Sequence, residues 1–200
     1  MTIPETIIIG TGNAHKIIEI HDALRDLPVK ILGLNEFAGV PEVIEDCETF
    51  AGNAAKKASE VAQTLGCWGM ADDSGLMVDA LGGAPGIYSA RYAGEHGDYK
   101  ANNEKLLREM AGVEEDKRGA RFVCVIALAD AVGKVAFTVE GVFEGEIAQK
   151  EIGENGFGYD PVFYLSEQRR TVAEMTLEEK NRVSHRALAL RAFRRKLLEM

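Results

Sequence analysis

The sequence has few cysteines and no long hydrophobic run, and each shortage excludes a class of protein. Its 200 residues include three cysteines, Cys47, Cys67 and Cys124, which are odd in number and too scattered for a paired metal-binding motif. No stretch approaches the ~18 apolar residues that span a bilayer, and the first residues lack the basic and apolar segments of a signal peptide. We therefore expect a soluble, cytoplasmic protein with reduced thiols.

Positive charge is also scarce. The 23 Lys and Arg are outnumbered by 32 Asp and Glu, which gives a formal net charge of −9. A broad nucleic-acid-binding or membrane-binding surface needs clustered cations, so neither partner is expected. A small anionic ligand held by a few local cations remains compatible with this balance. The length suffices for one domain, built as a single core or as a core with two lobes.

Two adjacent carboxylates, Asp72 and Asp73, follow the apolar run Cys67–Ala71. Like charges side by side at the end of a strand are costly unless water, a cation or a metal compensates them. Successive side chains of a strand point to opposite faces, so only one of the two carboxylates can face a given site. The ordinary alternative is a solvated Asp-Asp turn between two strands.

A glycine-containing turn joins the first predicted strand to the first predicted helix. The β-branched run Thr6–Ile9 predicts a strand, and apolar residues at helical spacing predict a helix over Ala14–Asp26. The turn between them, with Lys16 in the first helical turn, is typical of an anion site at a helix N-terminus. It lacks the spacing of a Walker loop, and such turns are also routine structural features of α/β proteins.

Further elements alternate along the chain. Thr49 is a suitable N-cap and Gly66 a suitable end for a helix over Phe50–Leu65, and Asp98 is a suitable N-cap for another helix. Strands are predicted over Val29–Leu34, Arg121–Ala129 and Val135–Phe143, with a turn at Asp130–Gly133 between the last two.

Two segments near the C-terminus combine aromatic, acidic and basic residues. The glycine-rich segment around Phe157–Asp160 suits a loop that sandwiches a flat ring and bonds to its edge, although a strained turn between strands is an equal alternative. Ser184 is a candidate cap for a terminal helix, which would place His185 and Arg186 in its first turn. Cations are unfavourable there, so an anionic or carbonyl-rich partner is expected nearby.

Four motifs, in order along the chain, carry a family resemblance. They are T-G-N-x-x-K at Thr11–Lys16, T-F-x-x-N-A-x-x-K-A at Thr49–Ala58, A-D-D-S-G-L with G-G-A-P-G-I-Y-S-A-R-Y, and G-F-G-Y-D-P-V-F with S-H-R. Together they resemble the inosine/xanthosine triphosphate pyrophosphatases, which remove deaminated purines from the nucleotide pool. The resemblance extends from Ile7 to about Leu190.

The resemblance implies a fold, a reaction and a cofactor. It implies a two-lobed α/β fold on a long twisted mixed sheet flanked by helices, forming one domain over residues 1–200 with the nucleotide in a cleft between lobes. It also implies a homodimeric, Mg²⁺-dependent hydrolase. The implied reaction converts ITP, dITP and XTP to the monophosphate and pyrophosphate.

The resemblance also implies roles for individual residues. Asp73 matches the catalytic base, and Glu45 with Asp73 matches the metal-binding acids. The residues that match the phosphate and sugar contacts are Thr11, Gly12, Asn13, Ala14, His15, Lys16, Lys57 and Ser74. The residues that match the base-recognising set are Phe157, Gly158, Tyr159, Asp160, Lys180, His185 and Arg186. The sequence departs from many relatives at Ala51-Gly52, where they carry an acid.

Other functions remain to be weighed. A nucleotide-binding regulator without hydrolysis would gain nothing from acids placed beside a triphosphate. A related pyrophosphatase for pyrimidine or modified nucleotides is a nearer alternative, which the S-H-R segment and the F-G-Y-D loop disfavour. A phosphatase with an aspartyl nucleophile is disfavoured because no DxDx[TV] run occurs.

Overall fold

A computed structural model describes residues 3–200, with the side chains of Ala14 and His15 outside the described part. The strands form one seven-stranded sheet in the order β2-β1-β3-β4-β5-β6-β7. It is mixed, because β1 pairs in parallel with β2 and β3 whereas β6 pairs antiparallel with β5 and β7. The strands are β1 (Thr6–Ile9), β2 (Lys30–Gly33), β3 (Trp68–Val78), β4 (Gly119–Ala129), β5 (Val135–Ile147), β6 (Phe163–Leu165) and β7 (Arg170–Thr171).

The chain folds as two compact units. Unit 1 comprises Met1–Asp73, Cys124–Gly141 and Arg186–Met200, and unit 2 comprises Ser74–Val123 and Val142–His185. Strands β3, β4 and β5 contribute residues to both units. The helices are α1 (Ala14–Leu24), α2 (Phe50–Leu65), α3 (Tyr99–Glu109), α4 (Leu177–Val183) and α5 (His185–Leu198).

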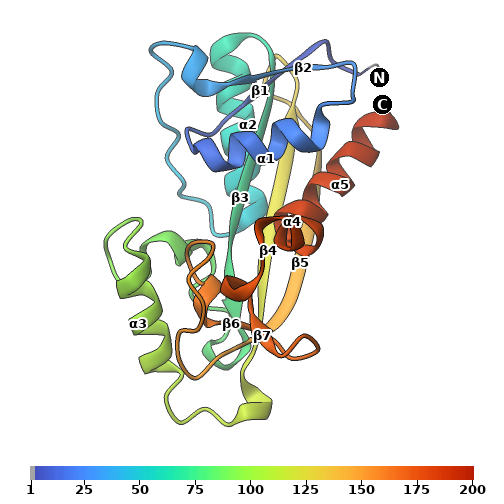
Figure 1. The fold of residues 1–200 in the computed structure, drawn as a ribbon. Helices are drawn as coiled ribbons and strands as arrows, with labels where there is room; N and C mark the ends of the chain where they lie inside the picture. The colour runs from blue at the N-terminus through green and yellow to red at the C-terminus, as the bar shows by residue number, and fades with distance from the viewer. Residues whose placement is uncertain (1–2) are drawn as a thin grey trace. The chain divides into compact units, whose positions relative to one another are not determined.

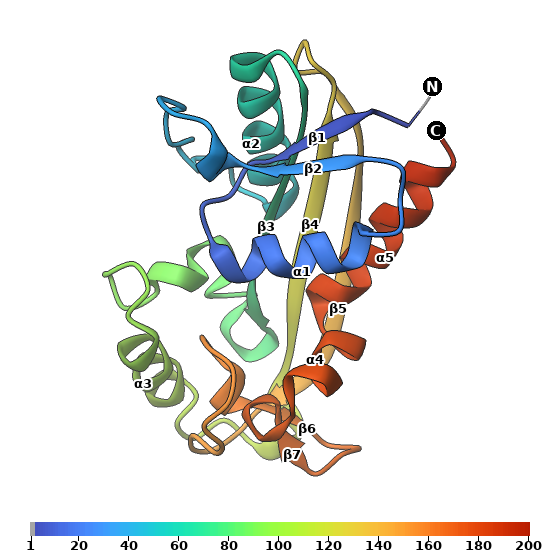
Figure 2. The same ribbon diagram turned by 45° about the horizontal axis from the view of Figure 1, so that its top comes forward.

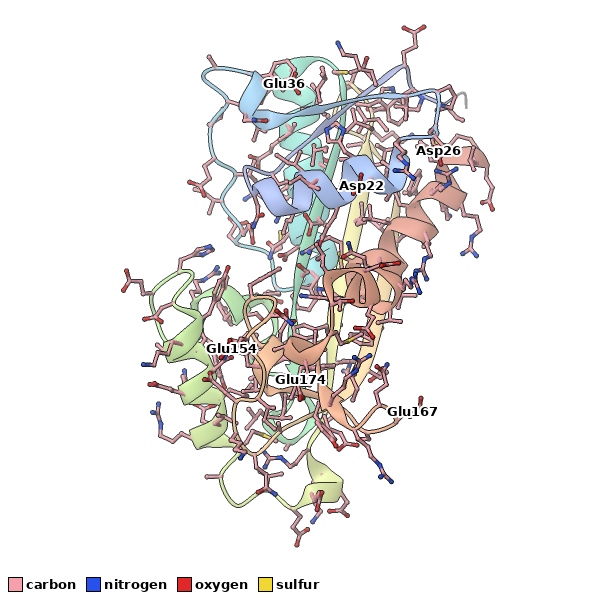
Figure 3. The ribbon with its side chains drawn as sticks, in the orientation of Figure 1. Asp22, Asp26, Glu36, Glu154, Glu167 and Glu174 are labelled. Atoms are coloured by element: carbon pink, nitrogen blue, oxygen red, sulfur yellow. The ribbon has the colours of Figure 1, made fainter. Side chains whose placement is uncertain are left out.

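In unit 1, helices cover both faces of the strands. In Figure 2, β1 and β2 pass between α2 and α1. Ile7 and Ile9 are fully buried and pack with residues of α1 and α5, including Leu24 and Phe193. Ile8 points to the opposite face because side chains alternate along a strand, and this is the face that α2 covers. Figure 3 shows exposed acids such as Asp22 and Asp26 on α1 and on the turn after it.

Unit 2 has a core of its own. Its buried aliphatic and aromatic side chains come from β3, β4, β6 and α3, as with Leu76, Phe122, Phe163 and Leu106. The rings of Phe122 and Phe163 lie 4.5 Å apart between centroids. Figure 1 shows α3 in this unit, next to the segment Gly86–Arg91 that precedes it. This core packs α3 against the C-terminal strands of unit 2.

Most predicted elements are confirmed. Helix α2 has the predicted bounds, with Thr49 accepting a hydrogen bond from Gly52 N and Gly66 in the left-handed conformation that ends it. The Asp-Asp turn, the alternative weighed for the two carboxylates, is absent, because β3 continues through Asp72 and Asp73 to Val78. The predicted α/β class and mixed sheet are confirmed. No helix within residues 3–200 is both long enough and apolar enough to cross a membrane.

Candidate active site

The register of β1 on β3 sets the position of the first glycine-containing turn. Ile9 pairs with Met70, and Gly10 N donates to Met70 O at 2.7 Å, so the chain leaves β1 beside Ala71 and Asp72. Within the turn, Thr11 Oγ1 accepts from Asn13 N at 3.2 Å. Asn13 Oδ1 in turn accepts from Lys16 N at 3.3 Å, which holds the first turn of α1. The predicted anion-binding turn therefore lies beside the carboxylates of β3.

Asp72 lies in a buried ionic cluster on the α1 and α5 face. Its side chain has no exposed surface, and its Oδ2 lies 2.8 Å from Lys16 Nζ and 3.6 Å from Arg186 Nε. The other side of the guanidinium reaches Glu19, with Arg186 Nη1 2.9 Å from Glu19 Oε2. Two cations and two anions thus alternate, which balances the charge of a carboxylate that would otherwise be costly to bury.

The charge of Asp72 is fixed by this cluster. Burial alone would raise the pKa of Asp72, but the positive charges of Lys16 and Arg186 outweigh it and hold that pKa well below its usual range. Burial and the neighbouring Asp72 charge raise the pKa of the Cys124 thiol to about 12, so this cysteine stays protonated. Asp72 is therefore a fixed negative charge and a poor proton acceptor at neutral pH.

Asp73 faces the opposite side, where α2 supplies its partners. Asn53 Nδ2 donates to Asp73 Oδ2 at 3.0 Å, and Lys57 Nζ lies 3.8 Å from Asp73 Oδ1. Lys57 also pairs with Glu45, with Nζ 2.7 Å from Oε1. The alternation along β3 thus gives the two carboxylates different surroundings on opposite faces, as predicted, and Asp73 keeps some access to solvent with a side chain 10% exposed.

The acids predicted to hold a metal, Glu45 and Asp73, come together around one ammonium group. Within the described residues, no three His, Cys, Asp or Glu side chains are placed to hold a metal ion by themselves. Mg²⁺ rarely needs such a cage, because it binds through one or two carboxylates together with substrate phosphates and water. The Lys57 ammonium already lies near both carboxylates, so Glu45 and Asp73 are placed to share one cation between them. The residues therefore fit a divalent metal.

Replacing Asp72 should reveal the cost of the buried cluster. Asp72→Asn removes the buried carboxylate charge that Lys16 and Arg186 compensate, and breaking a buried ion pair costs about 3–5 kcal/mol. We expect the free energy of unfolding in urea to fall by that amount, whereas exposed Asp46→Asn, which breaks the surface pair with Lys56 at 2.6 Å, should change it far less. Equal stabilities for the two variants would contradict the structural role of Asp72.

In unit 2, the residues predicted to recognise the base gather around Asp160. Its Oδ2 accepts from Phe157 N at 3.0 Å and from Lys180 Nζ at 2.5 Å, and the residue is 3% exposed. Lys180 Nζ also lies 4.6 Å from the centroid of the Phe157 ring. The loop is tight at Gly156, where an added Cβ would lie 2.0 Å from Asp160 Oδ2. One buried carboxylate therefore positions both an aromatic ring and an ammonium group.

Other members of the predicted base set also belong to unit 2. The His185 ring stacks on Phe122, with centroids 4.9 Å apart and planes at 15°. Gly158 O accepts from Asn103 Nδ2 at 3.1 Å, which ties the loop to α3. Ser74, predicted as a phosphate or sugar contact, is the first residue of unit 2 and is half-buried on β3.

Two predicted base contacts have other surroundings in the structure. The Tyr159 ring is buried in the unit 2 core and its hydroxyl donates to Ser89 O at 2.8 Å, so the ring is not presented for stacking. Arg186 belongs to unit 1, where its guanidinium lies beside Asp72 and Glu19, whereas Asp160 and Lys180 belong to unit 2. The predicted contacts of the Ala14 and His15 side chains lie outside the described part of the structure.

Sequence reasoning missed two asparagines that organise the site. Asn53, 1% exposed, hydrogen-bonds Asp73 and also accepts from Cys47 N at 3.0 Å. Asn103, 3% exposed, supports the loop at Gly158. The sequence signal for both is an asparagine on the apolar face of an amphipathic helix, because a buried amide needs hydrogen-bond partners.

The family profile that matches this chain covers residues 7–196, including every predicted site residue, and is that of the Ham1 family. The chain belongs to the Ham1 family. A relative from Rhodopirellula baltica, named dITP/XTP pyrophosphatase, is 49% identical over 194 residues, which cover 97% of this chain and 93% of the relative. A relative of the same name from Clostridium perfringens is 51% identical, with 92% of each chain covered.

Solved Ham1 structures share the fold. A HAM1 protein from Coxiella burnetii matches with a TM-score of 0.92 and 40% identity, and all of both chains is covered. The Ham1 protein of Staphylococcus aureus matches with a TM-score of 0.89 and 39% identity over 97% of this chain and 98% of the other. These likenesses agree with the mixed sheet and its helices as described above.

Proposed function

We propose that this Ham1-family protein hydrolyses deaminated purine nucleoside triphosphates, ITP, dITP and XTP, to the monophosphate and pyrophosphate. The observation that carries the proposal is the environment of Asp73. This carboxylate is oriented by Asn53 and lies near the Lys57 ammonium, while its neighbour Asp72 is locked in a separate ionic cluster. A positioned carboxylate beside cations is what proton abstraction next to a phosphate requires.

The phosphate contacts are supported by unit 1. The N-terminus of α1 presents backbone N–H groups and the positive end of its dipole, which favour an anion. Lys16 has a side chain 19% exposed and Lys57 one that is 11% exposed, so each ammonium can turn toward a ligand while keeping its carboxylate partner. These local cations offset the triphosphate charge that the protein's net charge of −9 would otherwise repel.

The chemical step is assigned to Asp73. Asn53 donates to Asp73 Oδ2 at 3.0 Å and so orients the carboxylate that accepts the proton of the attacking water. A bound Mg²⁺, held by Glu45 and Asp73, would offset phosphate charge and polarise the bond that breaks. Lys57 lies between these acids, and its positive charge would stabilise the negative charge that develops on the leaving pyrophosphate.

Recognition of the base is assigned to unit 2. Phe157 offers a ring that is 42% exposed, and Lys180 offers an ammonium donor held in place by buried Asp160. A 6-oxopurine presents a flat ring and a carbonyl acceptor, which match these two features. His185 is held by its stack on Phe122 and can add a donor from the start of α5.

The bond that breaks can be identified by isotope labelling. Hydrolysis of ITP with Mg²⁺ in ¹⁸O-labelled water should put the label in the monophosphate and leave the pyrophosphate unlabelled, because water attacks the α-phosphorus. Mass spectrometry of both products measures this directly. Label in pyrophosphate would place the attack at the β-phosphorus, and release of orthophosphate would contradict the pyrophosphatase assignment altogether.

The same assay separates the alternatives. Binding of ITP without release of either product would indicate a nucleotide-binding regulator, and faster turnover of UTP or CTP than of ITP would indicate a pyrimidine enzyme. The cytoplasmic location expected from the composition and the homodimer implied by the resemblance stay predictions. Light scattering of the purified protein tests the dimer. Substitution of Mn²⁺ or Ca²⁺ for Mg²⁺ tests the metal preference.

A further inference from the structure

A second partly exposed aromatic ring lies beside Phe157 in unit 2. The centroids of the Tyr99 and Phe157 rings are 6.1 Å apart and their planes meet at 44°. Tyr99 is 44% exposed and Phe157 42%, so both rings keep a face or an edge open to solvent. A tilted aromatic pair at this separation is mutually favourable, yet much of its apolar surface is uncovered.

Both rings are held by well-anchored backbone. Asp98 caps α3 by accepting from Ala101 N at 3.0 Å, which fixes Tyr99 as the first residue of the helix. One turn further, buried Asn103 donates to Gly158 O at 3.1 Å and so ties α3 to the loop that carries Phe157. The pair is therefore preorganised, and a ligand that covers it has little side-chain ordering left to impose.

The polar groups next to the Tyr99 and Phe157 rings indicate which kind of ligand would bind there. Lys180 lies over the Phe157 ring at 4.6 Å and is bonded to Asp160, so charged and polar groups border the aromatic surface. A partner with a flat π-face and a hydrogen-bonding edge satisfies both parts at once, whereas an aliphatic partner would leave the ammonium and carboxylate facing apolar groups.

We propose that Tyr99 is a further substrate-binding residue, which contacts the purine ring together with Phe157. The proposal rests on the proposed function and deepens it. Tyr99 extends the aromatic surface beyond the four-residue loop segment Phe157–Asp160 and supplies the second ring that the buried Tyr159 does not supply. Because stacking does not read the hydrogen-bonding edges of a base, Tyr99 adds affinity for all purines alike.

Steady-state kinetics with ITP and Mg²⁺ test the proposal through a split between KM and kcat. Tyr99→Ala should raise KM by about 5- to 20-fold, the lower part of the range for losing one base–aromatic contact, with kcat within about twofold. GTP should show the same factor. Tyr99→Phe should stay within about twofold of the wild type, since the ring and not the hydroxyl makes the contact.

Two further variants separate contact from other effects. Lys100→Ala removes the adjacent exposed side chain of α3, 83% exposed, and should leave KM unchanged. Tyr99→Leu keeps apolar packing against Phe157 but lacks a π-face, so it should behave like Tyr99→Ala. A Leu variant with the wild-type KM would show that Tyr99 only supports Phe157, and would overturn the contact.

Calorimetry of binding of the product IMP tests the Tyr99 contact separately from the hydrolysis of ITP. A weaker Kd in Tyr99→Ala supports the contact whether or not the wild type hydrolyses ITP. An active wild type whose Tyr99→Ala variant has unchanged KM and unchanged Kd for IMP overturns the role of Tyr99 alone. A wild type that neither hydrolyses ITP nor binds IMP overturns both proposals.

Discussion

Asp73→Asn is expected to lower kcat for ITP by at least ~10²-fold and to leave KM within about threefold. Asparagine has nearly the shape of aspartate and can still accept the hydrogen bond from Asn53 Nδ2. It cannot accept a proton from water at neutral pH. The fall in kcat therefore reports the loss of the proton acceptor and not a change in the surrounding structure. The rate of pyrophosphate release measures kcat.

A matched control is available on the same face of unit 1. Asp46 forms an ion pair with Lys56 of α2, as Asp73 lies near Lys57, but its side chain is 62% exposed. Asp46→Asn should keep at least half of the wild-type rate. If Asp73→Asn retained more than about a tenth of the wild-type kcat, the proton acceptor would have to be another group, and Glu45 would be the next to replace.

Asp72 is a poor substitute for Asp73 for a structural reason. Its carboxylate has no exposed surface, and the charges of Lys16 and Arg186 hold its pKa well below the usual range. It can orient Lys16 but cannot take up a proton near neutral pH. The adjacent carboxylates thus have different surroundings, with Asp72 between two cations and Asp73, the proposed proton acceptor, beside Asn53 and Lys57.

The sequence could predict elements whose ends are marked locally. Helix α2 begins after Thr49 and ends at Gly66 because a side-chain cap and a left-handed glycine act within one turn of the helix. The opposite orientations of Asp72 and Asp73 also followed from strand geometry alone. These predictions needed no knowledge of distant residues.

The remaining features depend on contacts between residues far apart in the chain. The continuation of β3 through two carboxylates requires Lys16, Arg186 and α2 to compensate them, and no local pattern announces those partners. The glycine-rich segment Phe157–Asp160 suggests aromatic rings that sandwich a flat ligand, with Tyr159 as one of them. Its hydroxyl instead reaches Ser89, 70 residues earlier, and the ring is buried.

The choice of base should show the largest effect of all. We expect kcat/KM for ATP to be about 10⁴–10⁵-fold below that for ITP, because adenine leaves the polar groups that recognise a 6-oxopurine unpaired. Lys180 Nζ is a donor with no acceptor capacity, which suits the 6-carbonyl of hypoxanthine and opposes the 6-amino group of adenine. Guanine shares the carbonyl, so GTP should be rejected less strongly than ATP.

Lys180→Met tests which group reads this carbonyl. The variant keeps the length of the side chain and removes its donor, so activity on ITP should fall far more than activity on ATP. The ITP-to-ATP ratio of kcat/KM should contract by at least about tenfold, the size of one charged hydrogen bond. Arg182→Met is the matched control on α4, because Arg182 pairs with Glu178 and its side chain is 71% exposed.

A variant of Arg186 tests whether Lys180 or the S-H-R segment donates to the 6-carbonyl of the base. Asp72 and Glu19 hold its guanidinium in unit 1, so Arg186→Lys should lower stability and leave the ITP-to-ATP ratio within about threefold of the wild type. A ratio that contracted in Arg186→Lys and stayed constant in Lys180→Met would assign the carbonyl to Arg186. That outcome would require the guanidinium to leave Asp72 when substrate binds, because a buried cation cannot serve both partners with the same donors.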